Sequence, residues 1–432
     1  MKPNETYRAE VRGWLEENLS GEFAGARGLG GPGREHEAFD VRLAWERHMA
    51  AAGWTCLGWP ERYGGRGASV EEQVVFHEEY ALARAPARVN HIGENLLGPT
   101  IIAFGTDEQR ARFLPPIVAA EELWCQGYSE PGAGSDLANV QTRAELVDDH
   151  GAVGGQGGGR AAGSERDGGG GSVGGQGGGP RSVGGLDGGE EGGRWRVSGQ
   201  KVWTSLAMEA DWCFVLCRTE PGSARHHGLS YLLVPMRQDG VDIRPIVQMT
   251  GTSEFNEVFF DGAVTGAANI IGAPGDGWKI AMATLGFERG VATLGQQVGF
   301  RRELEGIIAL ARETGALDDP LLRDRLVRSW IGLEAMRLNA VRTMAGIAAG
   351  APGPESSISK LVWGTWHREL GELAMDVLGA AGMIADGPPY DLSDEQRLYL
   401  FSRADTIYAG SNEIQRNIIA ERVLGLPREI RP

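Results

Sequence analysis

Apolar residues recur three and four positions apart through the first 123 residues, which is the spacing of amphipathic helices. The pattern predicts helices within four stretches: EVRGWLEENL, AFDVRLAWERHMAAAGW, SVEEQVVFHEEYALARA and TDEQRARFLPPIVAAEE. Glycines and a proline in WPERYGGRG predict a loop. Pro115 and Pro116 predict a further break in the last stretch. Residues 1–123 are therefore predicted to form an N-terminal helical domain.

The pattern changes at about residue 124. Short runs rich in Val, Ile, Phe and Trp, separated by turn residues, follow one another: RWRVSGQKVWTS, WCFVLCRTE, LSYLLVPM, GVDIRPIV and FNEVFFDGAV. Such runs predict a middle β domain over residues 124–271, folded as a sandwich or a barrel. From about residue 277 to 424 the helical spacing returns, and residues 272–432 are predicted to form a C-terminal helical domain. The predicted fold class is α+β.

A glycine-rich segment at about residues 148–193 interrupts the predicted β domain, and VGGQGGG occurs in it twice. Its few apolar side chains cannot offset the entropy lost on ordering, so we expect a disordered insertion. Without it, AELVDD would run into RWRVSGQ, which predicts a hairpin of the two flanking strands. Residues 170–174 match the GxSxG motif of serine hydrolases, but that motif acts only on a sharp strand-to-helix turn, and glycine tracts flank it here.

The 432 residues carry a net charge of −16, which disfavours general binding to nucleic acid or to an anionic membrane surface. The first residues lack the apolar core of a signal peptide, and no apolar run is long enough to span a bilayer. We therefore expect a cytoplasmic protein with no membrane span. Cys213 and Cys217 stand four apart in DWCFVLCR, where we expect small buried side chains on one strand face rather than a metal site.

Five stretches combine glycines, hydroxyl groups, aromatic rings or carboxylates in ways that suit a binding site. They are QGYSEPGAGSD (126–136), GQKVWTS (199–205), MTGTSEFNEVFFD (249–261), GWK through LGFERG (277–290), and RADTIYAGSNEIQRNII (403–419), which continues through ERVLGLP. Glycines let a ligand approach the backbone closely, and exposed N–H groups can bind its oxygens. Taken singly, each stretch has an ordinary alternative: the first could be a plain turn, and Trp203 could be a core residue.

Taken together and in this order, the five stretches resemble those of the acyl-CoA dehydrogenase family, and WPERYGG and SISKL fit it as well. The resemblance covers the chain apart from the glycine-rich segment. It implies an N-terminal helical domain, a middle β domain and a C-terminal helical bundle. FAD would lie in the cleft between the last two, partly held by a neighbouring subunit. The resemblance also implies a homotetramer or a heterotetramer, and an electron-transfer flavoprotein as the electron acceptor.

The resemblance further implies which residues contact the cofactor and the substrate. The residues implied to contact the FAD are Tyr128, Ser129, Gly134, Ser135, Trp203, Ser205, Ser411 and Glu413. Trp203 and Ser205 match the aromatic and hydroxyl residues beside the reactive face of the flavin. Those on the acyl-CoA are Ser135, Arg289, Tyr408 and Ala409.

The family reaction converts an acyl-CoA thioester into the trans-2-enoyl-CoA: a glutamate takes the α-proton while the β-hydride passes to flavin N5. Hydrogen bonds from a flavin hydroxyl and a backbone N–H to the thioester carbonyl acidify the α-proton. Many members carry the glutamate between the Tyr and the Gly, where this chain has Ala409. Others carry it before an arginine on the first long C-terminal helix, where this chain has Glu288 and Arg289.

Glu288 is therefore the predicted catalytic base, because it supplies the carboxylate that position 409 lacks, while Ala409 still offers a backbone N–H. Two other carboxylates, Glu254 and Glu257, lie in a strand-like stretch that the family keeps away from the α-carbon. A Glu–Arg pair on a helix can also be a solvated ion pair. Arg289 is assigned to positioning the base or the acyl-CoA.

Three departures from the family concern the CoA and the neighbouring subunit's FAD. Gly286 stands where an aspartate often contacts the CoA, Asp376 replaces a glutamine that reaches the neighbour's FAD, and Arg312 only partly matches the arginine of an RxxFG motif. Two alternatives stay open on the same fold: a non-catalytic or half-site subunit of a heteromeric enzyme, and an acyl-CoA oxidase. Because a base on the helix accompanies bulky acyl chains in some members, a branched or steroid side-chain acyl-CoA is a hypothesis for the substrate.

Overall fold

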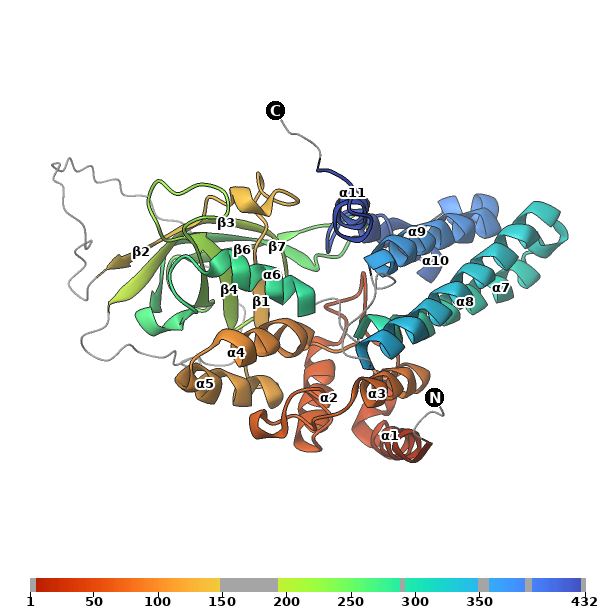
Figure 1. Cartoon of the computed structure of the whole chain (residues 1–432). Coiled ribbons are helices and arrows are strands. Elements are labelled where there is room, and N and C mark those ends of the chain that lie inside the picture. The colour runs from red at the N-terminus through yellow and green to blue at the C-terminus, as the bar shows by residue number, and fades with distance from the viewer. Residues whose placement is uncertain (1–4, 148–192, 288–291, 349–356, 385–390, 429–432) are drawn as a thin grey trace, which may run out of the picture.

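The computed structural model describes residues 5–147, 193–287, 292–348, 357–384 and 391–428. Figure 1 shows three groups of elements: helices of the N-terminal part at the bottom, the sheet at the left, and long helices of the C-terminal part at the right. The order of helix-rich, strand-rich and helix-rich parts predicted from the sequence is confirmed. The residues at which one domain ends and the next begins stay a prediction.

The N-terminal part is helical. Its α-helices are α1 (Glu5–Asn18), α2 (Phe39–Ala51), α3 (Val70–Leu82), α4 (Gly98–Phe104) and α5 (Asp107–Val118). Ser69 and Thr106 cap α3 and α5, because each hydroxyl accepts the backbone N–H three positions on, and that residue's side chain accepts the cap's N–H in return. These caps explain why the two helices begin where they do.

The break predicted at Pro115 and Pro116 is wrong, because α5 runs through both prolines. The prolines lack two N–H groups that a helix would normally use. Their neighbours Phe113, Leu114 and Ile117 are buried in the largest apolar cluster, and burial of three such side chains outweighs the lost hydrogen bonds.

One mixed sheet contains the strands of the described residues. They are β1 (Trp124–Gly127), β2 (Arg143–Val147), β3 (Arg194–Ser205), β4 (Trp212–Arg218), β5 (Leu229–Pro235), β6 (Val241–Ile246), β7 (Phe255–Gly266) and β8 (Ile270–Ile271). The order is β6-β7-β3-β2-β4-β5-β8, and β1 pairs in parallel with β4. Because β2 joins β4 through a single residue pair, Arg143 with Arg218, the sheet divides into two arms.

A shared core fills the space between the two arms. Val197 of β3 and Val258 of β7 belong to the same buried cluster as Leu232 of β5. The arms therefore face each other as in a sandwich, one of the two predicted arrangements. Cys213 and Cys217 of β4 lie in this cluster, which confirms that they are small buried side chains.

β2 and β3 form the predicted hairpin, with Val147 paired to Arg194 at the end where the connecting segment joins the two strands. Arg194, the first residue of β3, is paired with Gly266 of β7, and the carbonyl of the preceding Gly193 accepts the Ala267 N–H at 3.0 Å. The segment predicted as a disordered insertion lies outside the described residues, and so does the GxSxG match at residues 170–174.

The C-terminal part is helical again. Its α-helices are α6 (Gly277–Phe287), α7 (Ala292–Glu313), α8 (Pro320–Ala348), α9 (Ser359–Leu378), α10 (Asp394–Phe401) and α11 (Asn412–Ile418). α6 packs between α4 and the sheet, where the Thr284 hydroxyl hydrogen-bonds Thr100 at 2.8 Å. α7, α8 and α9 pack against one another (Figure 1). Within the ranges given above, we find no helix whose length and hydropathy would let it traverse a bilayer.

A loop of the N-terminal part links the sheet to the C-terminal helices. The carbonyl of Gly33 accepts the Arg397 guanidinium of α10 at 3.2 Å and the Thr252 hydroxyl of the β6–β7 connection at 3.4 Å. The ring of His36 is hydrogen-bonded to the Glu209 carboxylate at 2.9 Å and to the Ser253 carbonyl at 2.7 Å. This loop fixes the sheet relative to the C-terminal helices. The sheet carries one half of the candidate site, and the helices carry the other.

Candidate active site

The first predicted cofactor segment leaves the sheet at the end of β1. Tyr128 is buried, and its ring packs edge-on against that of Tyr231 with centroids 6.2 Å apart. The chain then turns outward, so that Ser129 is half-buried while Gly134 and Ser135 are exposed. A Cβ added at Gly134 would meet no atom within 4 Å. The outer part of this loop therefore has room for a ligand against its backbone.

A buried ion pair holds this loop to the sheet. Lys201 of β3 is 0% exposed and donates to the Glu130 carboxylate at 2.8 Å, the Tyr128 carbonyl at 3.0 Å and the Leu216 carbonyl at 2.8 Å. These three acceptors use all three N–H groups of the ammonium. Burial lowers the pKa of Lys201 in spite of Glu130. Burial alone would raise the pKa of Glu130, but the nearby Lys201 ammonium holds it below its ordinary value.

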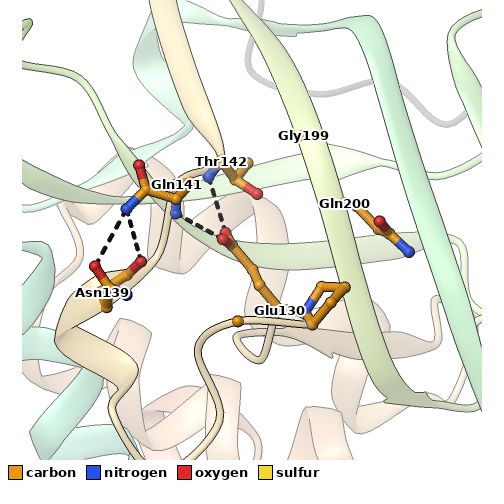
Figure 2. A pocket seen from close by; sticks show the side chains of 8 residues that line it. Glu130, Asn139, Gln141, Thr142, Gly199 and Gln200 are labelled. Carbon is orange, nitrogen blue, oxygen red and sulfur yellow. Dashed lines mark hydrogen bonds between the residues drawn. The ribbon is translucent and has the colours of Figure 1, made fainter.

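Glu130 also lines a pocket of about 260 Å³, which Figure 2 shows from close by. It is lined by Glu130, Pro131, Gly132, Asn139, Gln141, Thr142, Gly199 and Gln200. Figure 2 shows the Glu130 carboxylate directed at the chain leading into β2, where it accepts the N–H of Gln141 at 2.6 Å and of Thr142 at 2.9 Å. Glu130 is thus committed to holding the loop and is not free for proton transfer.

The second predicted cofactor segment contains a bulge in β3 between Lys201 and Thr204. The bulge places Trp203 at φ +61°, in the left-handed region that strains a residue with a side chain. It also turns the indole out of the core, since Trp203 is 57% exposed while Lys201 and Thr204 are buried. The interpretation of Trp203 as a core residue is therefore wrong. Its ring stands at the surface, and half-buried Ser205 ends the strand beside it.

The predicted substrate segment is a tight turn between the short 3-10 helix η9 (Ala404–Thr406) and α11. Ala409 has φ +51° and Gly410 has φ +85°, so two left-handed residues follow each other. The Gln415 side chain donates to both of their carbonyls, at 3.2 Å and 3.3 Å. Within the described part of the chain, the Ala409 N–H makes no hydrogen bond. It is therefore available as a donor.

The other two predicted cofactor residues lie where α11 begins. Ser411 is its N-cap, and the hydroxyl accepts the Ile414 N–H at 3.4 Å. Glu413 is exposed in the first turn, 3.5 Å from Arg416. A backbone N–H and the Ser411 hydroxyl hold the pKa of Glu413 below its ordinary value.

The predicted base Glu288 and its neighbour Arg289 lie outside the described residues. The two alternative carboxylates both act as acceptors within the sheet region. Glu254 is 2% exposed and accepts from the Thr252 hydroxyl at 2.9 Å and from Gln248. Glu257 of β7 accepts from the Gln200 side chain at 2.8 Å.

The residues that depart from the family pattern lie on three helices. Gly286 is in the last turn of α6, and Arg312 is in the last turn of α7. Asp376 of α9 is paired at 2.5 Å with Arg325 of α8. Its negative charge is therefore balanced within the chain.

The sequence analysis missed two buried charged pairs that hold segments of the candidate site. Lys201 and Glu130 form one, and His367 of α9 with Asp405 of η9 form the other, with the His367 Nδ1 2.5 Å from the Asp405 carboxylate. A signal was present for His367, because it precedes Leu370 and Ala374 by three and seven positions and so lies on the apolar face of its helix. Within the described ranges, no group of three or more His, Cys, Asp or Glu could hold a metal ion.

Three family models match the chain. They are the acyl-CoA dehydrogenase N-terminal domain over residues 3–121, the middle domain over residues 185–263 and the C-terminal domain over residues 275–424. The chain therefore belongs to the acyl-CoA dehydrogenase family. The acyl-CoA dehydrogenase IpdE1 of Mycobacterium tuberculosis is 59% identical over 429 residues, which cover 99% of each chain. This similarity along the full length supports an oxidoreductase.

Two solved structures are similar in fold and sequence. The ChsE4-ChsE5 complex from Mycobacterium tuberculosis matches with a TM-score of 0.74 and 29% identity over 99% of both chains. The Tcur3481-Tcur3483 steroid ACAD matches with a TM-score of 0.75 and 28% identity over 98% of both chains. Both comparisons support the three-part fold described above.

Proposed function

We propose that this chain binds FAD and removes one α- and one β-hydrogen from a bulky acyl-CoA, with Glu288 as the base. The observation that carries the proposal is the Trp203 ring, which the bulge in β3 holds at the surface at φ +61° beside Ser205. An exposed indole next to a hydroxyl offers a flat apolar face and a hydrogen-bond donor to a planar cofactor.

The described residues fit FAD on a second count. The hydroxyls of Ser129, Ser135 and Ser205 engage no other described residue, so they can donate to the ring and to the pyrophosphate. Tyr128 and Gly134 would complete this side, and Ser411 and Glu413 would approach from the helical side. When bound, FAD accepts the β-hydride of the substrate.

The proposed base acts on the α-carbon. The α-C–H bond breaks as its proton passes to the Glu288 carboxylate, and negative charge develops on the thioester oxygen. The Ala409 N–H would donate to that oxygen and stabilise the charge. Within the sheet region, the Glu257 carboxylate is engaged with Gln200 and one oxygen of Glu254 with Thr252, which supports Glu288 over either of them.

A bulky, ring-bearing acyl chain is the proposed substrate class, supported by the 28% identity to a steroid ACAD. The test is a panel of acyl-CoAs that runs from short straight chains to polycyclic ones, added without oxygen to the purified protein. We expect polycyclic thioesters to reduce the flavin fastest. Turnover of short straight chains alone would contradict the substrate class. An electron-transfer flavoprotein is the proposed acceptor, and it should reoxidise the reduced enzyme faster than oxygen does.

A second candidate is a half-site subunit that pairs with a different chain. Asp376 favours it, because an acid paired with Arg325 replaces the glutamine that the family directs at a neighbour's FAD. The match to the ChsE4-ChsE5 complex gives further support. The test is flavin content after purification alone and after co-expression with a candidate partner. Full occupancy of the chain alone would contradict this second candidate.

A further inference from the structure

A chain of hydrogen bonds, buried at its centre, connects three helices of the C-terminal part to the turn at Ala409. The Glu303 carboxylate of α7 lies 2.8 Å from Nε2 of His367, and Nδ1 of His367 lies 2.5 Å from the Asp405 carboxylate. The other oxygen of Asp405 accepts the Tyr408 hydroxyl at 2.5 Å. Asp405 thus joins the imidazole on α9 directly to the residue that precedes Ala409.

Asp405 and His367, at the centre of this chain, are buried, and a charge on a buried residue is costly unless an opposite charge balances it. Asp405 is 1% exposed and His367 is 6% exposed. With a carboxylate at each ring nitrogen, the imidazolium form can donate at both ends. Burial alone would lower the pKa of His367, but the hydrogen bonds to Asp405 and Glu303 outweigh it and raise the pKa to about 9. The geometry thus favours a charged chain: carboxylate, imidazolium, carboxylate.

The backbone around Asp405 is fixed by α9 as well. Lys360 donates its ammonium to the Asp405 carbonyl, and its Nζ lies 5.4 Å from the centroid of the Tyr408 ring. Gly364 allows the close approach, because a Cβ there would lie 2.7 Å from that same carbonyl oxygen. A glycine inside a helix costs stability, so its presence here fits a backbone that must come this near.

The turn that follows needs such support. Ala409 at φ +51° is strained, and a non-glycine residue keeps this conformation only when its surroundings hold it there. Gln415 fixes the carbonyl side of the turn through Ala409 and Gly410. The Tyr408–Asp405 bond fixes the side that leads into the turn. Between these two attachments lies the Ala409 N–H.

We propose that Asp405 and His367 are positioning residues that aim the Ala409 N–H at the thioester carbonyl, acting through Tyr408. The inference rests on the proposed function, in which that N–H stabilises charge on the carbonyl oxygen. A purely structural role would instead let these residues stabilise the bundle without affecting recognition of the carbonyl. The two roles predict different effects on the affinity for a ligand that lacks the carbonyl.

The experiment compares two ligands that differ only in the carbonyl: the CoA thioester of adamantane-1-carboxylic acid and the matching adamantylmethyl-CoA thioether. The thioester has no α-hydrogen and cannot react, so equilibrium binding to the flavin-loaded protein can be measured by calorimetry. A hydrogen bond to the carbonyl should make the wild type prefer the thioester by about tenfold. Asp405→Asn and His367→Gln should reduce the ratio of the two affinities to nearly one.

Tyr408→Phe is the gentler second variant, because it removes one hydroxyl and leaves the buried charges in place. It should lower the ratio by several-fold. Glu334→Gln is the matched control, since Glu334 of α8 forms an ion pair with Arg301 of α7 and no hydrogen bond or ion pair with the described residues of the turn. It should keep the wild-type ratio. Thermal melting of each variant shows that it is folded.

The outcomes separate the inference from the function on which it rests. If folded Asp405→Asn keeps the wild-type ratio, or if both ligands weaken equally in it, the positioning role is overturned while the proposed function stands. If the wild type itself does not distinguish thioester from thioether, the use of the Ala409 N–H fails, and the inference fails with it. If the wild type prefers the thioester and the variants do not, the result supports both the positioning role and the use of the Ala409 N–H.

Discussion

The sheet side and the helix side of the candidate site each bury a cation among oxygen atoms, but in different ways. Lys201 has one carboxylate and two backbone carbonyls as acceptors, all from the sheet and its β1 loop. His367 has two carboxylates, each from a different element. Burial therefore lowers the pKa of Lys201, whereas for His367 the two carboxylates together outweigh burial and raise the pKa.

The two halves of the site therefore depend on different kinds of interaction. On the sheet side the ladder of backbone hydrogen bonds already fixes β3. The Lys201–Glu130 ion pair then attaches the loop after β1 to this strand. On the helix side no ladder exists among the described residues. Within that part of the chain, η9 and the turn have only short-range backbone hydrogen bonds, such as that from the Ile407 N–H to the Ala404 carbonyl at 2.8 Å, and side chains attach them to α9. A lost contact should therefore cost more global stability on the sheet side than on the helix side, where it should also disturb the local geometry of the turn.

The largest expected effect is on the sheet side. Lys201→Met leaves the Glu130 carboxylate buried without its cation, so the free energy of unfolding should fall by about 3–5 kcal/mol. Denaturant unfolding at neutral pH measures it. Arg328→Met is the control, because the Arg328–Asp324 pair is solvent-exposed and is worth only about 0.3–0.5 kcal/mol. Equal losses in the two variants would contradict the importance of burial.

The next largest effect should depend on pH. The pKa of His367 is raised from 6.5 to about 9, so its charged contacts with Glu303 and Asp405 stabilise the fold fully below pH 6.5. That stabilisation should disappear as pH rises through about 9. Relative to His367→Gln, the wild type should be more stable by roughly 1–3 kcal/mol at pH 6. Thermal melting over a pH series measures the gap. A gap that widens above pH 9 would contradict this.

A smaller effect tests the close approach of η9 to α9. Gly364→Ala would bring a Cβ to 2.7 Å from the Asp405 carbonyl oxygen, so η9 must shift. We expect a net loss of about 1–2 kcal/mol in unfolding free energy, even though alanine favours the helix. Gly306→Ala on α7 is the matched control, because its Cβ would meet nothing within 4 Å. That control should be neutral or stabilising by up to about 1 kcal/mol.

The smallest effect should follow removal of residues 149–192. Val147 is paired with Arg194, so the deletion leaves Asp148-Gly193 as a two-residue link between paired positions. Asp-Gly is a favoured two-residue hairpin turn. Unfolding free energy and flavin content should both stay near those of the full chain. Aggregation of the shortened protein would show that the segment has a packed role.

The sequence was enough to predict the order of helices and strands and the β2–β3 hairpin, because these follow from periodicity and turn residues. The proline break failed because burial of Phe113 and Leu114 is a tertiary effect. Trp203 at the surface required the bulge, which no pattern of apolar residues reveals. Lys201, like His367, depends on partners far apart in sequence, and only the fold brings them together.

We propose that Glu288 is the base of an active dehydrogenase. The most direct test is anaerobic loss of the bound flavin's visible absorbance after acyl-CoA is added, with wild type and Glu288→Gln side by side. We expect bleaching in the wild type and a rate at least about a hundredfold lower in the variant. Equal bleaching in both proteins, each with full flavin occupancy, would contradict the assignment of the base.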